Sequence, residues 1–376
     1  MAKKKSKYWD IHNILSKACI YNIVIGERSN GKTYGTLKHG LEEYFKNGSE
    51  IAIIRRMEED FRGKRANTLF APLIKDGIIE KLSKGQYNSI KYYSQRWYLE
   101  YKTSKKEECY TSDIPFAYAF ALTSMEHDKS SSYPNVRTII FDEFLTRTMY
   151  LADEFVTFQN VLSTIIRDRN DATIFMLGNT INKYCPYFKE MGLTNIKTQR
   201  QDTIDVYTYG DTGLRVAVEY CGDLAKKNKE PKKSDVYFAF NNPKLQMIKG
   251  GSWEIDIYPH LPVKYVPRDI KYMYFIEFDG ETLQCEIIAK PYQERDTMFT
   301  YIHRKTTPIK DNDGKYLIYQ TNYSPLPNVN RRLTKPKNKL EKFILSFYAN
   351  DKVFYQDNDV GELVRNYLQW CDYSRI

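Results

Sequence analysis

The chain has 376 residues, of which 42% are hydrophobic, so its length suggests two domains with packed cores. Its net charge of +10 favours an anionic partner, although a basic surface that serves only solubility is an open alternative. The six cysteines and five histidines are too scattered for a metal knuckle, and we expect structural thiols in a reducing cytoplasm. We expect no signal peptide, because no apolar segment follows the basic start at residues 1–7, and no membrane partner, because no apolar run reaches spanning length.

The first strong pattern follows a basic arm at residues 3–7. An apolar run at 21–25 leads into Gly-x-x-x-x-Gly-Lys-Thr at residues 26–33, which is the spacing of a P-loop. Gly26 and Gly31 permit backbone angles and close approaches that a Cβ would block. A helix predicted at 33–46 and ended by Asn47-Gly48 supports this interpretation over a simple glycine-containing turn.

This loop predicts that the protein binds ATP with Mg²⁺. Its N–H groups would face phosphate oxygens at a helix N-terminus, while Lys32 would place its charge beside the β- and γ-phosphates. Thr33 and Asp142 are the predicted metal-binding residues. The predicted nucleotide-binding residues are Gly26, Glu27, Arg28, Ser29, Asn30, Gly31, Lys32, Thr33, Asp142 and Asn179.

The first 200 residues alternate short apolar runs with helical patterns, which predicts an α/β domain with a mostly parallel sheet. Core strands are expected at 21–25, 51–55, 137–141 and 172–177. A more polar stretch at 87–112 alternates in hydrophobicity, turns at 103–108 and is predicted to be an inserted β-hairpin.

A second motif completes the predicted ATPase site. The apolar run 138–141 ends in Asp142-Glu143, which places two carboxylates at the carboxyl edge of the sheet. Asp142 would hold Mg²⁺, and Glu143 would activate the attacking water. Two carboxylates favour an ATP-hydrolysing motor over a GTP switch. We expect the 51–55 strand to insert between the strands of the two motifs, as in the additional-strand (ASCE) class of P-loop ATPases.

Several polar residues near these motifs keep two interpretations each. Arg167 and Arg169 follow a helical pattern, so they would serve either as an arginine finger to a neighbouring subunit or as partners of the helix dipole. Asn179 would sense the γ-phosphate or simply stabilise a turn. Arg55 and Arg56 would contact phosphate or a partner, or do neither.

The chain beyond residue 200 has a different pattern. Residues 201–234 are expected to form a linker region, because 225–234 is charged and contains proline. Residues 235–376 are predicted to form a small α+β domain with strands at 272–278, 283–288 and 298–303. Asp279-Gly280 predicts a tight hairpin between the first two. Helices are expected at 338–349 and 359–371, and 304–337 is expected to be an extended loop.

Taken together, these residues resemble the DNA-packaging ATPases, or encapsidation proteins, of small phi-29-like tailed phages. The similarity is densest at residues 22–33, 53–56, 130–144, 161–169 and 177–188. The stretch 133–144, which ends in the acidic motif, is especially close to the family pattern, as is Asn179 followed by Pro186-Tyr187-Phe188. A weaker similarity runs through 274–299 and 340–360.

The resemblance implies a homopentameric ring that docks on a phage portal through a structural packaging RNA and pumps double-stranded DNA into a prohead. By matching position, Arg167 and Lys129 would act across the subunit interface, in addition to the catalytic Glu143 of each subunit. The family further implies that residues 235–376 form an RNase H-like, vestigial nuclease domain. It also implies that the protein works in the cytoplasm of the bacterial host. Glu277 and Asp279 leave residual metal binding open.

Two other classes of function compete with the motor: a helicase or other nucleic-acid-stimulated ATPase, and a nucleotide-dependent scaffold that binds nucleic acid without net work. The absence of the usual helicase motif series after residue 179 counts against the first. Lys32 and Glu143 count against the second. A basic tract in the C-terminal domain is the favoured contact for nucleic acid, with 226–233 a second and a solvated loop the alternative. The tract comprises Arg331, Arg332, Lys335, Lys337 and Lys339.

Overall fold

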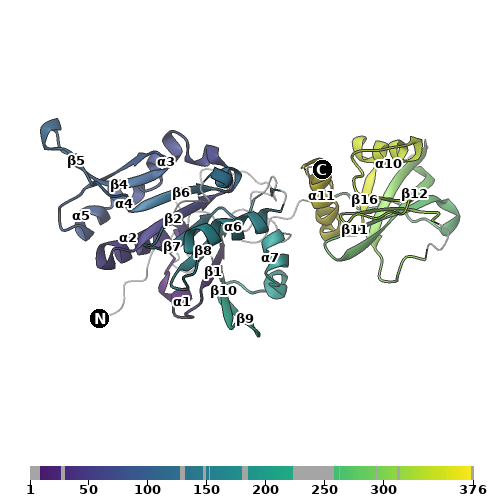
Figure 1. Cartoon of the computed structure of the whole chain (residues 1–376). Coiled ribbons are helices and arrows are strands. Elements are labelled where there is room, and N and C mark those ends of the chain that lie inside the picture. Colours follow the sequence, from purple (N-terminus) through teal and green to yellow (C-terminus); the bar gives the residue numbers. More distant parts are fainter. Residues whose placement is uncertain are drawn as a thin grey trace. The chain divides into compact units, whose positions relative to one another are not determined.

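The computed structural model describes ten ranges of the chain and divides it into two compact units, Met1–Glu254 and Ile255–Ile376 (Figure 1). Within the described ranges we find no helix with the length and apolar character that a membrane crossing requires. The described ranges are 9–26, 30–127, 132–146, 150–151, 153–179, 185–222, 258–261, 263–292, 295–310 and 314–373.

The first unit is built on a mixed, mostly parallel sheet, which has ten strands in the described part of the chain. Six neighbouring strands, from β6 to β10, run parallel, whereas the strands at both edges are antiparallel. The predicted α/β class is therefore confirmed for this unit. In spatial order the strands are β3 (Ser89–Tyr93), β4 (Arg96–Tyr101), β6 (Ala117–Ala121), β2 (Glu50–Arg55), β7 (Val136–Asp142), β8 (Thr173–Asn179), β1 (Tyr21–Gly26), β10 (Leu214–Cys221) and β9 (Thr203–Tyr209), while β5 (Tyr110–Thr111) pairs with β4.

Helices cover both faces of this sheet, which explains why its central strands are apolar along almost their whole length (Figure 1). One core layer contains Leu37, Phe70 and Ile79, and the other contains Phe158 and Tyr187. The first layer is built by α1 (His12–Leu15), α2 (Lys32–Asn47), α3 (Lys64–Thr68), α4 (Ala71–Lys75) and α5 (Ile78–Leu82), and the second by α6 (Glu154–Ile166) and α7 (Pro186–Glu190).

The strand between the two motif strands is β8, so our prediction that the 51–55 strand would insert there is wrong. β8 pairs with β1 on one side and with β7 on the other, while β2 lies beyond β7. Both β2 and β8 are buried along most of their length, so their hydrophobicity does not distinguish the two positions. After β1, the chain passes through α2 and crosses two strand positions before it forms β2. The later strands β7 and β8 occupy these two positions.

The stretch 87–112 forms antiparallel hairpins at the sheet edge. The turn expected at 103–108 joins β4 to the short β5, and a second turn that was not predicted joins β3 to β4. β3 and β4 pair antiparallel, and the turn residues Ser94 and Gln95 have φ angles of 48° and 59°, as in the mirror-image turns that suit hairpins. β4 also pairs with β6, so the hairpin extends the main sheet. Trp97 is fully buried under the helices and donates its indole N–H to the Ala66 carbonyl at 3.1 Å.

Part of the segment that we expected to be a linker belongs to the first sheet. Residues 203–221 form β9 and β10, and β10 pairs parallel with β1. The charged stretch 225–234 lies outside the described residues. The linker prediction rested on the charged, proline-containing stretch 225–234 alone, and no strand was predicted between residues 201 and 224.

The second unit contains a mixed sheet with six strands in its described residues. The turn between the first two has Asp279 and Gly280 at φ angles of 54° and 77°, which confirms the predicted tight hairpin. Two of the strands fall within 304–337, which we had expected to be an extended loop. In spatial order the strands are β15 (Val329–Asn330), β14 (Leu317–Gln320), β11 (Ile270–Phe278), β12 (Glu281–Tyr292), β13 (Arg295–Arg304) and β16 (Val353–Tyr355).

Two helices complete the second unit, close to the predicted positions. They are α10 (Lys339–Ala349) and α11 (Asn358–Tyr373). Asn338 caps α10, since its side chain accepts a hydrogen bond from the Glu341 N–H at 2.9 Å. Phe347 and Tyr367 are buried, and the rings of Tyr367 and Phe278 are in contact, so both helices contribute to one core with the sheet.

Candidate active site

The two predicted motifs meet at the carboxyl edge of the first sheet. Gly26 ends β1, Asp142 ends β7 and Asn179 ends β8, and the register pairs Gly26 with Asn179 and Asp142 with Leu177. Parallel α/β sheets bind ligands at this edge. The structure therefore brings together residues that are up to 153 positions apart in the sequence.

Lys32 lies in the centre of this edge, at the start of α2. Its ammonium group donates to the Gly26 carbonyl at 3.2 Å, to Asn30 Oδ1 at 3.1 Å and to Asn179 Oδ1 at 3.4 Å. The side chain is 6% exposed. Gly31 precedes it with φ of 90°, a left-handed angle that favours glycine. These contacts aim a buried positive charge at the loop between β1 and α2.

The threonine and aspartate predicted to bind metal are in direct contact. Thr33 Oγ1 donates to Asp142 Oδ1 at 3.0 Å, and Arg55 Nη2 forms an ion pair with Asp142 Oδ2 at 2.7 Å. Burial lowers the pKa of Arg55, but the Asp142 and Glu143 carboxylates outweigh this and raise it above its ordinary value. Hydroxyl and carboxylate oxygens are ligands that suit Mg²⁺. Arg55 is thus a partner of the acidic motif, a role that the sequence left undecided.

Asn30 carries an unsatisfied donor beside the loop. Its Nδ2 atom is buried and has no hydrogen-bond partner among the described residues, although its main-chain carbonyl accepts from the Trp9 N–H at 2.9 Å. A buried amide N–H without a partner is costly, and a ligand oxygen would satisfy it. A Cβ on Gly26 would lie 2.8 Å from Cys221 Cβ and 3.1 Å from Asn30 Nδ2, so glycine is required there. This part of the loop therefore fits an anionic oxygen ligand.

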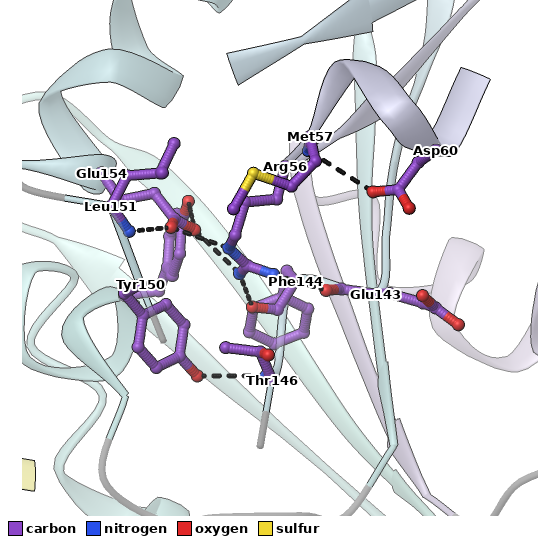
Figure 2. Close-up of polar contacts among 10 residues, drawn as sticks. Arg56, Met57, Asp60, Glu143, Phe144, Thr146, Tyr150, Leu151 and Glu154 are labelled. Atoms are coloured by element: carbon purple, nitrogen blue, oxygen red, sulfur yellow. Dashed lines mark hydrogen bonds and ion pairs between the residues drawn. The ribbon is translucent and has the colours of Figure 1, made fainter. Parts of the chain in front are cut away.

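Glu143 follows directly after β7 in an unusual conformation. It is exposed, and its φ angle of 60° lies in the left-handed region. Figure 2 shows its carboxyl group extending away from Arg56, which approaches its main-chain carbonyl. The neighbouring Phe144 is fully buried, so the chain turns from an exposed carboxylate into the core within one residue.

Arg56 does not face the candidate site, in contrast to Arg55. Arg56 directly follows β2 and is buried, with its Nε 2.8 Å from Glu154 Oε2. Of the alternatives that the sequence left open for Arg56, its burial and its pairing with Glu154 support neither a phosphate nor a partner contact. Glu154 was missed in the sequence, whereas its partner Tyr187 was noted there as part of the family pattern at residues 186–188.

The two arginines after α6 lie at its far end from this site. Arg169 donates to the Ile165 and Tyr133 carbonyls, both at 3.1 Å, so it stabilises the helix C-terminus. Arg167 ends α6 and is exposed, with φ of 52°. Glu154 at the other end of α6 contacts Arg56 beside the carboxyl edge. Since 13 helical residues span about 20 Å, Arg167 is remote from Thr33 in its own subunit.

Some predicted site residues lie outside the described part of the chain: Glu27, Arg28, Ser29 and Lys129. The basic tract of the second unit is described and belongs to a different unit from the P-loop. Arg331 donates to the Thr321 carbonyl at 2.8 Å and lies over the Trp370 ring, and Lys337 donates to Asn330 Oδ1 at 3.0 Å. Lys335 and Lys339 are exposed. In the described residues, no group of three or more metal-ligating side chains is found.

A family model described as podovirus DNA encapsidation protein (Gp16) matches residues 3–211, which is more than half of the chain. The DNA packaging protein of Bacillus phage B103 is 27% identical over 183 residues, which cover 48% of this chain and 50% of that protein. The DNA packaging protein of Bacillus phage phi29 is 25% identical over 205 residues, which cover 54% and 55%. The aligned stretch therefore spans about half the length of these relatives.

Two solved structures resemble the chain over nearly its whole length. The Phi-28 gp11 DNA packaging motor has a TM-score of 0.54 and 17% identity, with 99% of this chain and 100% of that chain covered. The bacteriophage Phi-29 viral genome packaging motor assembly has a TM-score of 0.53 and 18% identity, with 96% and 97% covered. At such identities the likeness shows a shared fold.

Proposed function

Because the chain belongs to the podovirus DNA encapsidation protein (Gp16) family, we propose that it is an ATP-driven motor that moves viral double-stranded DNA into a preformed capsid. One observation carries this proposal. Lys32, Thr33 and Asp142 converge at one sheet edge in a chain whose relatives are DNA packaging proteins.

The residues at this edge fit ATP hydrolysis. The loop between β1 and α2, with Lys32 and the unsatisfied amide of Asn30, binds the phosphates of ATP. Thr33 and Asp142 hold Mg²⁺, which supplies positive charge to the phosphoryl oxygens when it is bound. Glu143, exposed at the end of β7, accepts a proton from the attacking water. Asn179 contacts Lys32 and is placed to respond to the γ-phosphate.

A second subunit completes each active site in this proposal. Arg167 is exposed and remote from its own P-loop, so it reaches the phosphates of a neighbour, with Lys129 as a second basic residue. This arrangement requires a ring. The family resemblance suggests a homopentamer that docks on the portal of a prohead through a structural RNA, in the cytoplasm of the host. The relatives solved as packaging motors support an assembly of this kind.

The second unit supplies contacts to nucleic acid or the portal in this proposal. Its sheet has an antiparallel run β11–β12–β13, with β14 parallel to β11, an arrangement compatible with the RNase H-like fold that the family implies. Glu277 lies opposite Gln320 on β14, so the neighbouring strand adds no carboxylate at that position. We therefore favour a vestigial nuclease that binds without cutting.

Assays of ATP hydrolysis, DNA packaging, strand separation and nucleic-acid binding test the motor against its alternatives. ATP hydrolysis is measured with and without double-stranded DNA, and proheads are then supplied to assay packaging of DNA into a nuclease-resistant form. A motor gives DNA-stimulated hydrolysis and ATP-dependent protection of the DNA. DNA-stimulated hydrolysis with strand separation and no protection would favour a helicase. Nucleic-acid binding without hydrolysis would favour a scaffold.

A further inference from the structure

We propose that Arg56 is a positioning residue for the water-activating Glu143, and that it acts on the main chain of Glu143 rather than on its carboxylate. This inference rests on the proposed function, because it assumes that Glu143 serves ATP hydrolysis. Figure 2 shows the cluster that carries it, which joins the end of β2 to the segment after β7 and to the first turn of α6.

The conformation of Glu143 needs external support. A φ angle of 60° is unfavourable for a residue with a side chain, and such angles persist only where the surroundings fix them. Arg56 Nη1 donates to the Glu143 carbonyl at 3.4 Å, and Nη2 donates to the Phe144 carbonyl at 2.7 Å. On the other side, the Phe144 N–H donates to the Leu177 carbonyl of β8 at 3.2 Å. The peptide units that follow Glu143 are therefore held from two sides.

The guanidinium of Arg56 is itself fixed by a buried carboxylate. Its Nε and Nη2 each lie 2.8 Å from an oxygen of Glu154, in the two-pronged geometry that guanidinium and carboxylate groups share. Glu154 also accepts from the Tyr187 hydroxyl at 2.8 Å and from the Leu151 N–H at 2.7 Å. The side chains of Arg56 and Glu154 are 9% and 0% exposed. Neither group has freedom to move independently of the other.

The hydrogen bonds of this cluster converge on the main chain that follows Asp142. A buried ion pair is weak evidence for stability, because desolvation offsets much of its attraction. Here, however, the remaining donors of the pair are used on the two carbonyls that follow the acidic strand. Small displacements of a catalytic group cost large factors in rate. The geometry thus points to a cluster that fixes the main chain at Glu143 and thereby the position from which its carboxylate side chain extends.

The substitution Arg56→Lys tests this inference, because lysine keeps the charge and loses the planar fork. We expect the turnover number for ATP to fall by about tenfold or more, while the affinity for a non-hydrolysable ATP analogue changes by less than about twofold. Tyr187→Phe keeps the ring and removes one donor to Glu154, so it should give a smaller fall of the same kind. It replaces Arg56→Lys if that variant does not fold.

A matched control is Arg137→Lys. Arg137 also pairs with a carboxylate and donates to a main-chain carbonyl, but it lies at the amino end of β7. Turnover should be unchanged in this variant. If Arg137→Lys and Arg56→Lys reduce turnover equally, the cluster has no special connection to Glu143.

The decisive measurement combines Arg56→Lys with Glu143→Gln in single-turnover experiments. If Arg56 acts through Glu143, the lysine substitution has no further effect once the carboxylate is absent. Effects that multiply would overturn the inference, as would undiminished turnover in Arg56→Lys alone. Absence of hydrolysis in the unaltered chain would instead overturn the proposed function, so the two failures are distinguishable.

Discussion

At the edge of the first sheet, two side chains bind the carboxylate of Asp142. Asp142 accepts from Thr33 and pairs with Arg55, so both of its oxygens have protein partners. A metal ion that binds there has to displace part of this network. In the structure, the Arg55 guanidinium therefore occupies one oxygen of the Asp142 carboxylate that the proposed reaction would offer to Mg²⁺. Metal binding would replace this positive side chain by a positive ion.

The first prediction concerns the residues assigned to phosphate, metal and water. Lys32→Ala and Asp142→Ala should abolish ATP turnover, the first through lost phosphate binding and the second through lost Mg²⁺. Glu143→Gln should bind ATP and hydrolyse it slower by at least about a hundredfold, since general-base catalysis contributes factors of this size. Nucleotide binding and turnover are measured separately. Near-normal turnover in Glu143→Gln would mean that another residue activates the water.

A second prediction at this scale concerns His303 in the second unit. A hydrogen bond to Glu286 raises the pKa of His303 above 6.5, with burial acting in the opposite direction. Burial raises the pKa of Glu286, but His303, Tyr265 and Gln284 outweigh this and hold it below 4.5. The histidine contribution is complete below pH 6.5 and is lost as pH rises through the folded pKa. The glutamate contribution is complete above pH 4.5 and is lost on acidification.

The pair therefore stabilises the fold most between about pH 4.5 and 6.5. His303→Gln should lower the thermal unfolding temperature at pH 6, and the difference from the unaltered chain should shrink at pH 8.5. The exposed His12 provides the control, because His12→Gln should give a small difference at both pH values. A deficit in His303→Gln that grew with pH would contradict the assignment.

Among the elements, β8 is tightly packed at Gly178, directly beside the segment that follows Glu143. A Cβ on Gly178 would lie 2.8 Å from Leu145 Cδ1 and 2.8 Å from Phe144 Cε1, both in buried side chains. Gly178→Ala should therefore destabilise the chain by about 1–3 kcal/mol and shift the segment that follows Glu143. Gly210→Ala is the matched control, because a Cβ there meets nothing within 4 Å. Chemical denaturation of both variants gives the comparison.

The position of α6 leads to a prediction about neighbouring subunits. Arg167 ends this helix far from its own P-loop, so we expect it to act in trans. Arg167→Ala and Lys32→Ala should each abolish turnover. A mixture of the two proteins should recover part of it, because some mixed interfaces contain both intact residues.

Subunit exchange is confirmed in the mixture by tagging one protein. Mixed assembly without any recovery, at every ratio tested, would count against trans action. Arg169 would then be examined, although its hydrogen bonds to the Ile165 and Tyr133 carbonyls give it a role in ending the helix.

For the whole molecule, the net charge of +10 predicts a salt-dependent contact with nucleic acid. In the basic tract, Arg331 and Lys337 have contacts within the second unit, whereas Lys335 and Lys339 are exposed. Lys335→Glu with Lys339→Glu should weaken binding of the full chain to RNA or double-stranded DNA. The slope of log affinity against log salt should fall by roughly 0.7–0.9 per lost phosphate contact.

Exposed lysines of the first unit provide the control for that experiment. Lys75→Glu with Lys81→Glu makes the same change in net charge at α4 and α5. Binding that responds equally to both pairs would indicate a general charge effect and would remove the basic tract as a specific contact.

The sequence by itself determined the local chemistry of this protein. The P-loop spacing, the acidic strand end and the Asp279-Gly280 hairpin are short-range patterns, and each residue type there answers a requirement of its own backbone or charge. The resemblance to packaging ATPases rested on the same short stretches, and the family match confirms it.

Only the tertiary structure decided which distant segments meet. β2 and β8 are both apolar, and their order in the sheet depends on long-range pairing, which joins residues 153 apart for β1 with β8 and 87 apart for β2 with β7. The same applies to the neighbouring residues Arg55 and Arg56, because their different partners, Asp142 and Glu154, come from elsewhere in the chain. Burial and pairing depend on many segments at once. A local pattern therefore indicates that a strand or a charged side chain needs a partner, whereas the packing of the whole unit determines which partner it has.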